Sequence, residues 1–219
     1  DADGDTELST YQWQINGAIY GSGTTLTSGY QTGDIVSCLI TPFDGYDYGT
    51  QVVDSLVIDN SPPILDAVSI NPNPAYANDV LICNLGSTTD ADGTTSFTYT
   101  YDWMVNGVSQ TINANTTTGI ASKGDLVQCM ATPNDGTENG TTVLSNSITI
   151  SNSQPSISTV SISPSNPSIT DTLVCSWSGF SDDDNDSDQS TVAWSNGGIT
   201  IGTGSSINSG FVAGDTVIC

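Results

Sequence analysis

Tryptophan and cysteine recur along this chain of 219 residues at a nearly constant spacing. One series of tryptophans has separations of 90 and 91 residues, at Trp13, Trp103 and Trp194. Two series of cysteines keep a period of 90 to 92 residues, with Cys38, Cys129 and Cys219 in one and Cys83 and Cys175 in the other. Landmarks that share one period indicate tandem copies of a single domain of about 91 residues.

Two short segments that contain proline separate the copies. The first linker, residues 60–63, reads Asn-Ser-Pro-Pro, and the second linker, residues 152–155, reads Asn-Ser-Gln-Pro. We predict a partial copy at 1–61 without its front strands, a complete copy at 62–153, and a partial copy at 154–219 without its last strand. The chain is therefore expected to be a window of a longer array that extends at both ends. Short proline linkers are expected to hold neighbouring domains close together.

The local patterns are those of strands and tight turns. No stretch keeps a helical period, and in segments such as 124–129 apolar and polar residues alternate after a Gly-Asp turn. Asn-Gly pairs such as Asn106-Gly107 supply the positive φ that a type I′ hairpin turn requires. We therefore predict an all-β fold built from tandem β-sandwich domains.

The order cysteine, tryptophan, cysteine predicts how each copy is held together. In a sandwich of this kind two facing strands carry the cysteines, and an indole from a third strand packs on the bridge. The expected pairs are Cys83 with Cys129 and Cys175 with Cys219, and the partner of Cys38 is expected upstream of residue 1. Disulfides persist in oxidising compartments, so the cysteines predict a secreted or cell-surface protein.

The charge of the chain restricts its partners. It has 24 acidic residues, one lysine, no arginine and no histidine, which gives a formal charge of −23. Nucleic acids and anionic membranes are excluded as partners, because neither polyanion would find counter-charges here. No window is apolar enough to insert into a bilayer. Two explanations of the charge stay open, cation binding and a generic solubilising surface. Lys123 is expected to be a surface residue.

Acidic loops between the first cysteine and the tryptophan of each copy are the best candidate sites. The middle acidic loop spans residues 90–93 and the third acidic loop spans 182–188, and both carry alternating carboxylates of the kind that calcium prefers. A second acidic turn follows the second cysteine and is expected at the same end of the domain, near the linker. The candidate calcium ligands are Asp1, Asp3, Asp5, Asp44, Asp90, Asp92, Asp135, Asp182, Asp184 and Asp186. Plain turns, for which Asp and Gly are well suited, and another cation are the alternatives.

Catalytic chemistry has few candidates in this sequence. The chain lacks a histidine to move protons near neutral pH, and its cysteines are assigned to bridges, so we predict that it is not an enzyme. Acceptor triplets for N-linked glycans stand at Asn115, Asn139 and Asn185, and they matter only if the source organism glycosylates.

Several motifs together resemble a known class of repeat. They are Asp-x-Asp-Gly at 90–93, Tyr-x-Trp-x-x-Asn-Gly at 101–107, the Gly-Asp turn before Cys129, and Thr-Pro-Asn-Asp-Gly at 132–136. With them the whole chain resembles the tandem immunoglobulin-like repeats of large bacterial and archaeal secreted surface proteins, which include polycystic-kidney-disease-type and cadherin-like modules. The Trp-Asp-Phe-Gly-Asp-Gly signature of the polycystic-kidney-disease type is absent at Trp103. The resemblance implies immunoglobulin-like β-sandwiches that act as spacers, stalks or adhesins, with calcium between domains in several relatives.

Two functional hypotheses follow. The first is a structural segment of a long extracellular stalk or fibre with calcium-stiffened junctions, whose partners are neighbouring repeats and other copies of the chain. The second is an adhesin that recognises carbohydrate or protein through its loops. Aromatic residues in one loop, Phe43, Tyr46 and Tyr48, support the second hypothesis because such rings stack on sugars.

Overall fold

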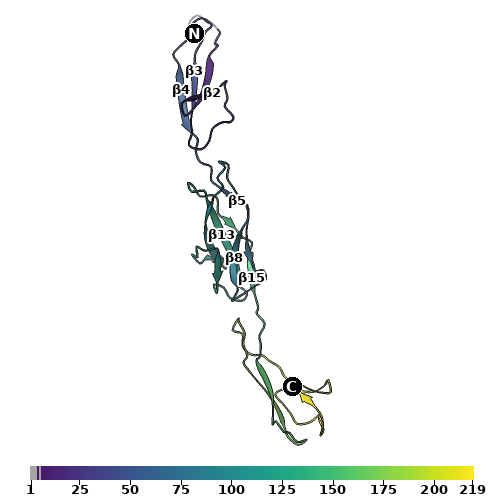
Figure 1. The fold of residues 1–219 in the computed structure, drawn as a ribbon. Helices are drawn as coiled ribbons and strands as arrows, with labels where there is room; N and C mark the ends of the chain where they lie inside the picture. The colour runs from purple at the N-terminus through teal and green to yellow at the C-terminus, as the bar shows by residue number, and fades with distance from the viewer. Residues whose placement is uncertain (1–3, 5) are drawn as a thin grey trace. The chain divides into compact units, whose positions relative to one another are not determined.

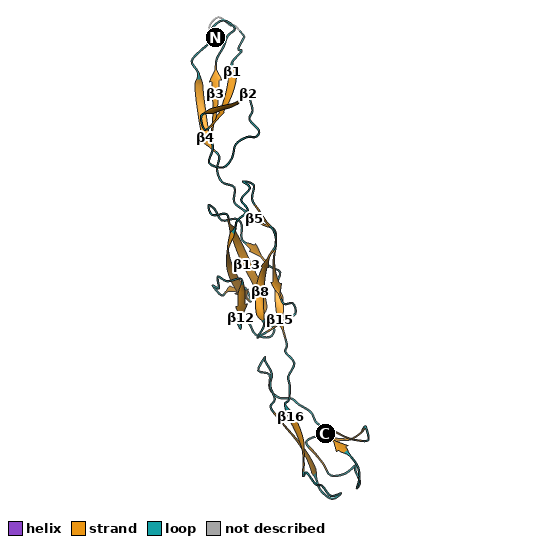
Figure 2. Ribbon diagram, viewed as in Figure 1, coloured by secondary structure: helices purple, strands orange, loops and turns teal. Residues whose placement is uncertain are grey.

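A computed structural model describes residue 4 and residues 6–219 of the chain. Over this described part the regular structure consists of strands joined by turns and loops, without a helix (Figure 2). The prediction of an all-β fold is therefore confirmed. Within the same residues, no helix exists that could serve as a membrane span.

The chain forms two compact units. One contains residues 1–69, 84–102 and 129–145, and the other contains residues 70–83, 103–128 and 146–219. The repeat boundaries predicted from the sequence near residues 61 and 153 stay predictions.

The first unit begins with an antiparallel sheet in the order β2-β1-β3-β4 (Figure 1). Its strands are β1 (Thr10–Ile15), β2 (Ala18–Ser22), β3 (Ile35–Thr41) and β4 (Val52–Val57). The side chains of Val36 and Leu39 on β3 are buried, whereas all six residues of β4 are exposed. The two-residue turn between β1 and β2 has φ of 52° at Asn16 and 80° at Gly17, as the Asn-Gly pair predicts.

Short pairings complete the first unit. β5 (Ile64–Leu65) pairs antiparallel with β9 (Thr88–Thr89), and β14 (Val143–Leu144) pairs with Met130 and Ala131 of β13 (Leu126–Asn134). Every second residue of β13 from Val127 to Pro133 is buried. This alternation is the burial pattern of a strand with one face on a core.

Two further sheets use the segments around residues 68–151. One has the order β12-β8-β6, with β6 (Val68–Asn71), β8 (Val80–Leu85) and β12 (Thr116–Thr118). The other has the order β11-β10-β13-β15-β7. Its remaining strands are β7 (Ala75–Tyr76), β10 (Thr98–Val105), β11 (Val108–Ser109) and β15 (Ile148–Ser151). Ile148 and Ile150 of β15 are buried, and β7 runs parallel to β15.

The last part of the second unit contains two three-stranded sheets, β16-β17-β20 and β19-β18-β21. The strands are β16 (Thr159–Ser163), β17 (Leu173–Ser178), β18 (Ala193–Asn196), β19 (Ile199–Thr203), β20 (Ser206–Ile207) and β21 (Val217–Ile218). Leu173, Cys175 and Trp194 form the buried centre between them. The indole N–H of Trp194 donates to the carbonyl of Gly204 at 2.9 Å, so its one polar group is satisfied within the core.

The described residues contain two disulfides. Cys175 is bonded to Cys219, as the repeat pattern predicts. Cys83 and Cys129 are both disulfide-bonded, and Cys38 is a free thiol. Disulfides of this kind are typical of proteins from oxidising compartments.

Each Asn-Gly hairpin is tied to the Gly-Asp turn that precedes the next cysteine strand. The side-chain amide of Asn106 donates to Asp125 at 2.7 Å, and its carbonyl oxygen accepts from the Leu126 N–H at 3.0 Å. The same amide-to-carboxylate bond joins Asn16 to Asp34 and Asn196 to Asp215. This side-chain tie fixes the register between the hairpin and the neighbouring strand in three places.

Candidate functional site

The third acidic loop brings three carboxylates together. One oxygen each of Asp182, Asp184 and Asp186 lies within 4.8 Å of the others. The loop closes on itself because Oδ1 of Asp182 accepts from the backbone N–H groups of Asp184 at 2.9 Å and Asp186 at 3.1 Å. Short aspartate side chains bond readily to backbone N–H groups a few residues ahead, which explains why this sequence forms a compact turn.

Some carboxylate oxygens of the acidic loops are buried without a partner. Oδ2 of Asp182 and Oδ1 of Asp184 have no hydrogen bond within the described part of the chain, and neither does Oδ2 of Asp90. Asp90 and Asp182 hold equivalent places in their loops, because Oδ1 of Asp90 likewise accepts from the N–H of Asp92, at 2.7 Å. A buried carboxylate oxygen is costly unless something pairs with it.

Both linkers are hydrogen-bonded to the acidic loop that follows them. The backbone N–H of Ser61 donates to Oδ2 of Asp92 at 2.6 Å. Ninety-two residues later, the backbone N–H of Ser153 donates to Oδ2 of Asp184 at 2.5 Å. The serine and the aspartate are separated by 31 residues in both cases. The same contact is therefore made twice, by residues at equivalent positions one repeat period apart.

The asparagine of each linker makes a further contact. The side-chain amide of Asn60 donates to Oδ2 of Asp135 at 2.8 Å, and it lowers the pKa of that carboxyl together with the backbone N–H groups of Glu138 and Thr137. In the second linker, the side-chain oxygen of Asn152 instead accepts from the ammonium of Lys123 at 3.0 Å. The asparagines at equivalent positions of the two linkers, Asn60 and Asn152, therefore have different partners.

The turn residues Thr32 and Lys123, 91 positions apart, both contact an acidic loop. A hydrogen bond from the Thr32 side chain and, after it, one from the Ser61 N–H lower the pKa of Asp92. Lys123 forms an ion pair with Asp186, which raises the pKa of the ammonium. A carboxyl whose pKa falls on folding stabilises the fold above the ordinary aspartate pKa, and this stabilisation is lost as pH drops through the lowered value. The Thr32 and Ser61 contacts to Asp92 are therefore present at neutral pH.

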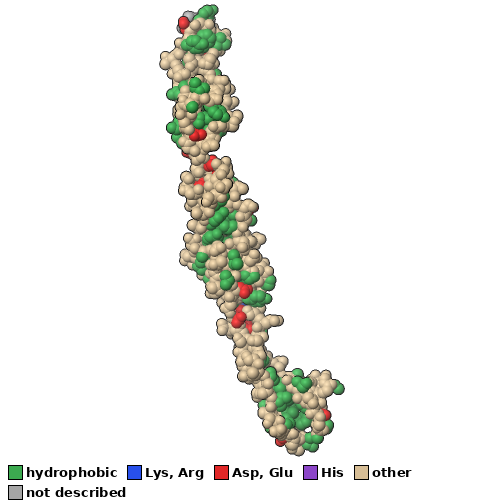
Figure 3. Space-filling view, in the orientation of Figure 1, with side chains coloured by type: hydrophobic (Ala, Val, Ile, Leu, Met, Phe, Trp, Pro, Cys, Tyr) green, Lys and Arg blue, Asp and Glu red, His purple; other side chains and the backbone are tan. Residues whose placement is uncertain are grey.

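The structure separates the predicted ligands into different groups. Asp92 and Asp135 each contact the first linker, but only Asp182, Asp184 and Asp186 form a three-carboxylate cluster among the described residues. Asp44 closes its own turn, with its Oδ1 accepting from the N–H groups of Tyr46 and Asp47. Asp1, Asp3 and Asp5 lie outside the described residues. On the face shown in Figure 3, acidic side chains stand in small groups within a mostly neutral surface.

The other predicted sites are accessible. Asn115, Asn139 and Asn185 are exposed, so each could be reached by a glycosylating enzyme, and their modification stays a prediction. In the loop that contains Asp44, the rings of Phe43 and Tyr48 stack with centroids 4.4 Å apart. Tyr46 projects from the same loop with 82% of its surface exposed.

Sequence reasoning missed the residues that join the linkers to the loops. The Asn-Ser pair recurs in both linkers, at Asn60-Ser61 and Asn152-Ser153, but the sequence alone indicates no contact for it beyond the linker. Lys123 is exposed, as predicted, and it also contacts Asn152 and Asp186, which the sequence did not indicate. The recurrence of Asn-Ser at the linkers was the available signal, since neither residue is required by a proline turn.

No protein-family model matches the chain, and no curated protein is similar to it in sequence.

Proposed function

We propose that this chain is a structural segment of a long extracellular stalk or fibre, built from tandem immunoglobulin-like β-sandwich repeats. The observation that carries the proposal is the repeated bond from a linker serine to the following acidic loop, Ser61 to Asp92 and Ser153 to Asp184. A linker that only had to connect two domains would not need the same serine-to-aspartate bond in both places. A spacer needs it, because its length depends on a constant geometry at each joint, meaning each linker together with the acidic loop that follows it.

Each joint has more than one contact. At the first, Asn60 and Ser61 are bonded to Asp135 and Asp92, which come from two different loops. At the second, Ser153 is bonded to Asp184, and Lys123 contacts Asn152 and Asp186. Bonds to several loops restrict rotation of the linker backbone, in addition to the stiffness of its prolines. These contacts support a semi-rigid connection.

Calcium is the cation we propose for these joints. Asp182, Asp184 and Asp186 would hold it at the second joint, and Asp90, Asp92 and Asp135 would contribute at the first. The unpaired oxygens Asp182 Oδ2, Asp184 Oδ1 and Asp90 Oδ2 support this assignment, because calcium takes carboxylate oxygens at about 2.3–2.6 Å. Two oxygens on opposite sides of such an ion are about 5 Å apart, which fits the spacing of the cluster. The bound ion would offset the repulsion among these carboxylates, because the chain has only one basic side chain, Lys123, to do so.

Calcium is expected to raise the melting temperature of the chain and to make it longer and stiffer in small-angle X-ray scattering. At a calcium concentration about 100 times the Kd, ligand binding stabilises the bound part by about 2.7 kcal/mol. Asp184→Asn should remove most of the calcium-dependent rise, because it replaces a cluster carboxylate. The matched control is Asp183→Asn, which changes the net charge equally at an exposed neighbour outside the cluster.

Two outcomes would count against these ideas separately. If neither melting nor scattering differs between calcium and chelator, the aspartates are turn residues and the calcium assignment fails. If the scattering shows freely jointed domains under both conditions, the stalk itself fails.

An adhesin is the second candidate, and the loop at residues 43–48 favours it. Tyr46 and Tyr48 are 82% and 69% exposed, and Tyr48 stacks on Phe43. Exposed, pre-arranged rings provide faces on which sugars can stack. We expect binding on a glycan array to disappear in a Tyr46→Ala/Tyr48→Ala variant if this function holds. An array on which the unmodified chain binds nothing, together with unchanged cell adhesion by the variant, would exclude it.

A further inference from the structure

The single lysine of the chain stands at the second joint. Its ammonium forms an ion pair with Asp186 and donates to the side-chain oxygen of Asn152 at 3.0 Å. Lys123 could have paired with any of 24 acidic residues, yet it contacts the loop in which three carboxylates lie together. One ammonium therefore connects the second linker to the third acidic loop.

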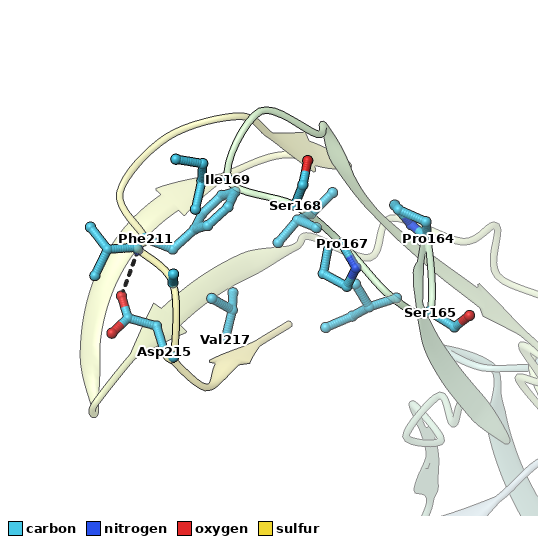
Figure 4. Close-up of a pocket in the computed structure, with 13 residues that line it drawn as sticks. Pro164, Ser165, Pro167, Ser168, Ile169, Phe211, Asp215 and Val217 are labelled. Carbon is cyan, nitrogen blue, oxygen red and sulfur yellow. Dashed lines mark hydrogen bonds between the residues drawn. The ribbon is translucent and has the colours of Figure 1, made fainter.

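This contact is the one ion pair among the described residues. Other carboxylates are met by neutral donors. An apolar cavity of about 630 Å³ in the second unit, for example, has one charged side chain in its lining, Asp215 (Figure 4). That carboxylate accepts from the backbone N–H of Val212 at 2.8 Å, the contact drawn in Figure 4. Asp186 differs from it in having a positive charge as its partner.

The first joint has an uncharged residue at the position that the lysine holds in the second. The side chain of Thr32, 91 residues before the lysine, is hydrogen-bonded to Asp92. The Ser61 N–H also donates to Asp92, and the Asn60 amide donates to Asp135. All of these donors are neutral, so within the described part of the chain no positive charge offsets the carboxylates of the first joint.

The ammonium is bound to a carboxylate that a metal ion at this cluster would use. Oxygens of Asp182, Asp184 and Asp186 lie within 4.8 Å of one another, and Lys123 contacts Asp186. A second cation at Asp186 would face the ammonium at close range, and like charges repel strongly there. The lysine can move away, because its ammonium ends a flexible four-carbon stem and its side chain is 38% exposed. The ammonium and a metal ion therefore compete for the same carboxylate.

We propose that Lys123 is the built-in cation of the second joint, so that this joint is held without a metal ion and calcium enters it only in exchange for the ammonium. The first joint, with Thr32 at the same position, has no such substitute. The inference rests on the proposed function for its calcium assignment, and it adds how the two joints differ. At low calcium the second joint would keep its geometry while the first loosens.

The test compares the unmodified chain with a Lys123→Thr variant, which gives the second joint the residue of the first. The backbone N–H of Ser153, which donates to Asp184, reports on the second joint, and that of Ser61, which donates to Asp92, reports on the first. In chelator, amide exchange measured by NMR should be about threefold faster at Ser153 in the variant, the size expected for an exposed ion pair, and unchanged at Ser61.

Titration with calcium chloride provides the second comparison. The Ser153 amide should reach half-saturation at about threefold less calcium in the Lys123→Thr variant, because no ammonium has to be displaced. Lys123→Arg is the matched control, since it keeps a positive charge at this position, and it should retain slow exchange at Ser153 in chelator. The reverse change, Thr32→Lys, should slow exchange at Ser61 in chelator.

Equal exchange at Ser153 in the unmodified chain and the Lys123→Thr variant overturns the proposal, and so does a calcium midpoint that does not depend on the residue at position 123. If the substitution changes exchange at Ser153 in chelator but neither Ser61 nor Ser153 responds to calcium, the role of Lys123 is supported and the calcium assignment of the proposed function fails. The stalk is tested separately by scattering, so the two proposals can fail independently.

Discussion

Replacing Trp103 by alanine is expected to lower the free energy of unfolding by about 3–5 kcal/mol, the range for removing a large buried aromatic side chain. Trp103 has no exposed surface, and its indole N–H donates to the carbonyl of Ala114 at 2.9 Å. The substitution would leave a cavity in place of the indole and would remove this hydrogen bond to the Ala114 carbonyl. The loss can be measured by urea denaturation, with tryptophan fluorescence and near-ultraviolet circular dichroism as the two signals.

The matched control is Trp13→Ala. Trp13 makes the equivalent bond, from its indole N–H to the carbonyl of Gly23 at 3.0 Å, but it is only partly buried. A smaller loss is therefore expected at Trp13 than at Trp103. Equal losses at the two positions would show that burial of the indole does not determine its contribution.

Removing the disulfide between Cys175 and Cys219 is expected to cost about 4 kcal/mol. The bond joins residues separated by 44 positions, and closing a loop of that length in the unfolded chain accounts for this amount in the chain-entropy description. A Cys175→Ser/Cys219→Ser variant should melt at a lower temperature in calorimetry.

Cys38→Ser is the control, because it replaces a cysteine by serine without breaking a disulfide, since Cys38 is free in the structure. It should leave the melting profile nearly unchanged. A double variant that melts like the unmodified chain would contradict the expectation and would assign the stability of this region to its apolar packing alone.

The parts of the fold that could be predicted from the sequence depend on neighbouring residues. Asn16-Gly17 and Asn106-Gly107 both adopt positive φ, as their residue types require. Alternating strands such as β13 were predictable because a strand with one buried face must alternate. The disulfide between Cys175 and Cys219 followed from the recurrence of cysteine at the repeat period.

The contacts between the linkers and the acidic loops could not be predicted from neighbouring residues. Lys123 and Asp186 are 63 residues apart in sequence, and their separation in space depends on the path of the second linker. The acidic loops illustrate the same limit. Residues 90–93 and 182–188 both contain alternating aspartates, but only the longer loop places three carboxylates together among the described residues. In the middle loop, Oδ1 of Asp90 accepts from the backbone N–H of Asp92, and Oδ2 of Asp92 accepts from the Ser61 N–H of the linker. The third candidate, Asp135, comes from another turn.

The hairpin asparagines also determine how the chain ages chemically. An asparagine followed by glycine is the pair most prone to deamidation, since the small neighbour lets the backbone nitrogen attack the side-chain amide. In the folded chain, Asn106 is held by bonds to Asp125 and to the Leu126 N–H, which keep its amide away from that attack. Once a hairpin opens, deamidation would convert the amide donor into a second carboxylate facing Asp125. The hairpin could then not close with its original bond, so each local opening carries a risk of permanent damage.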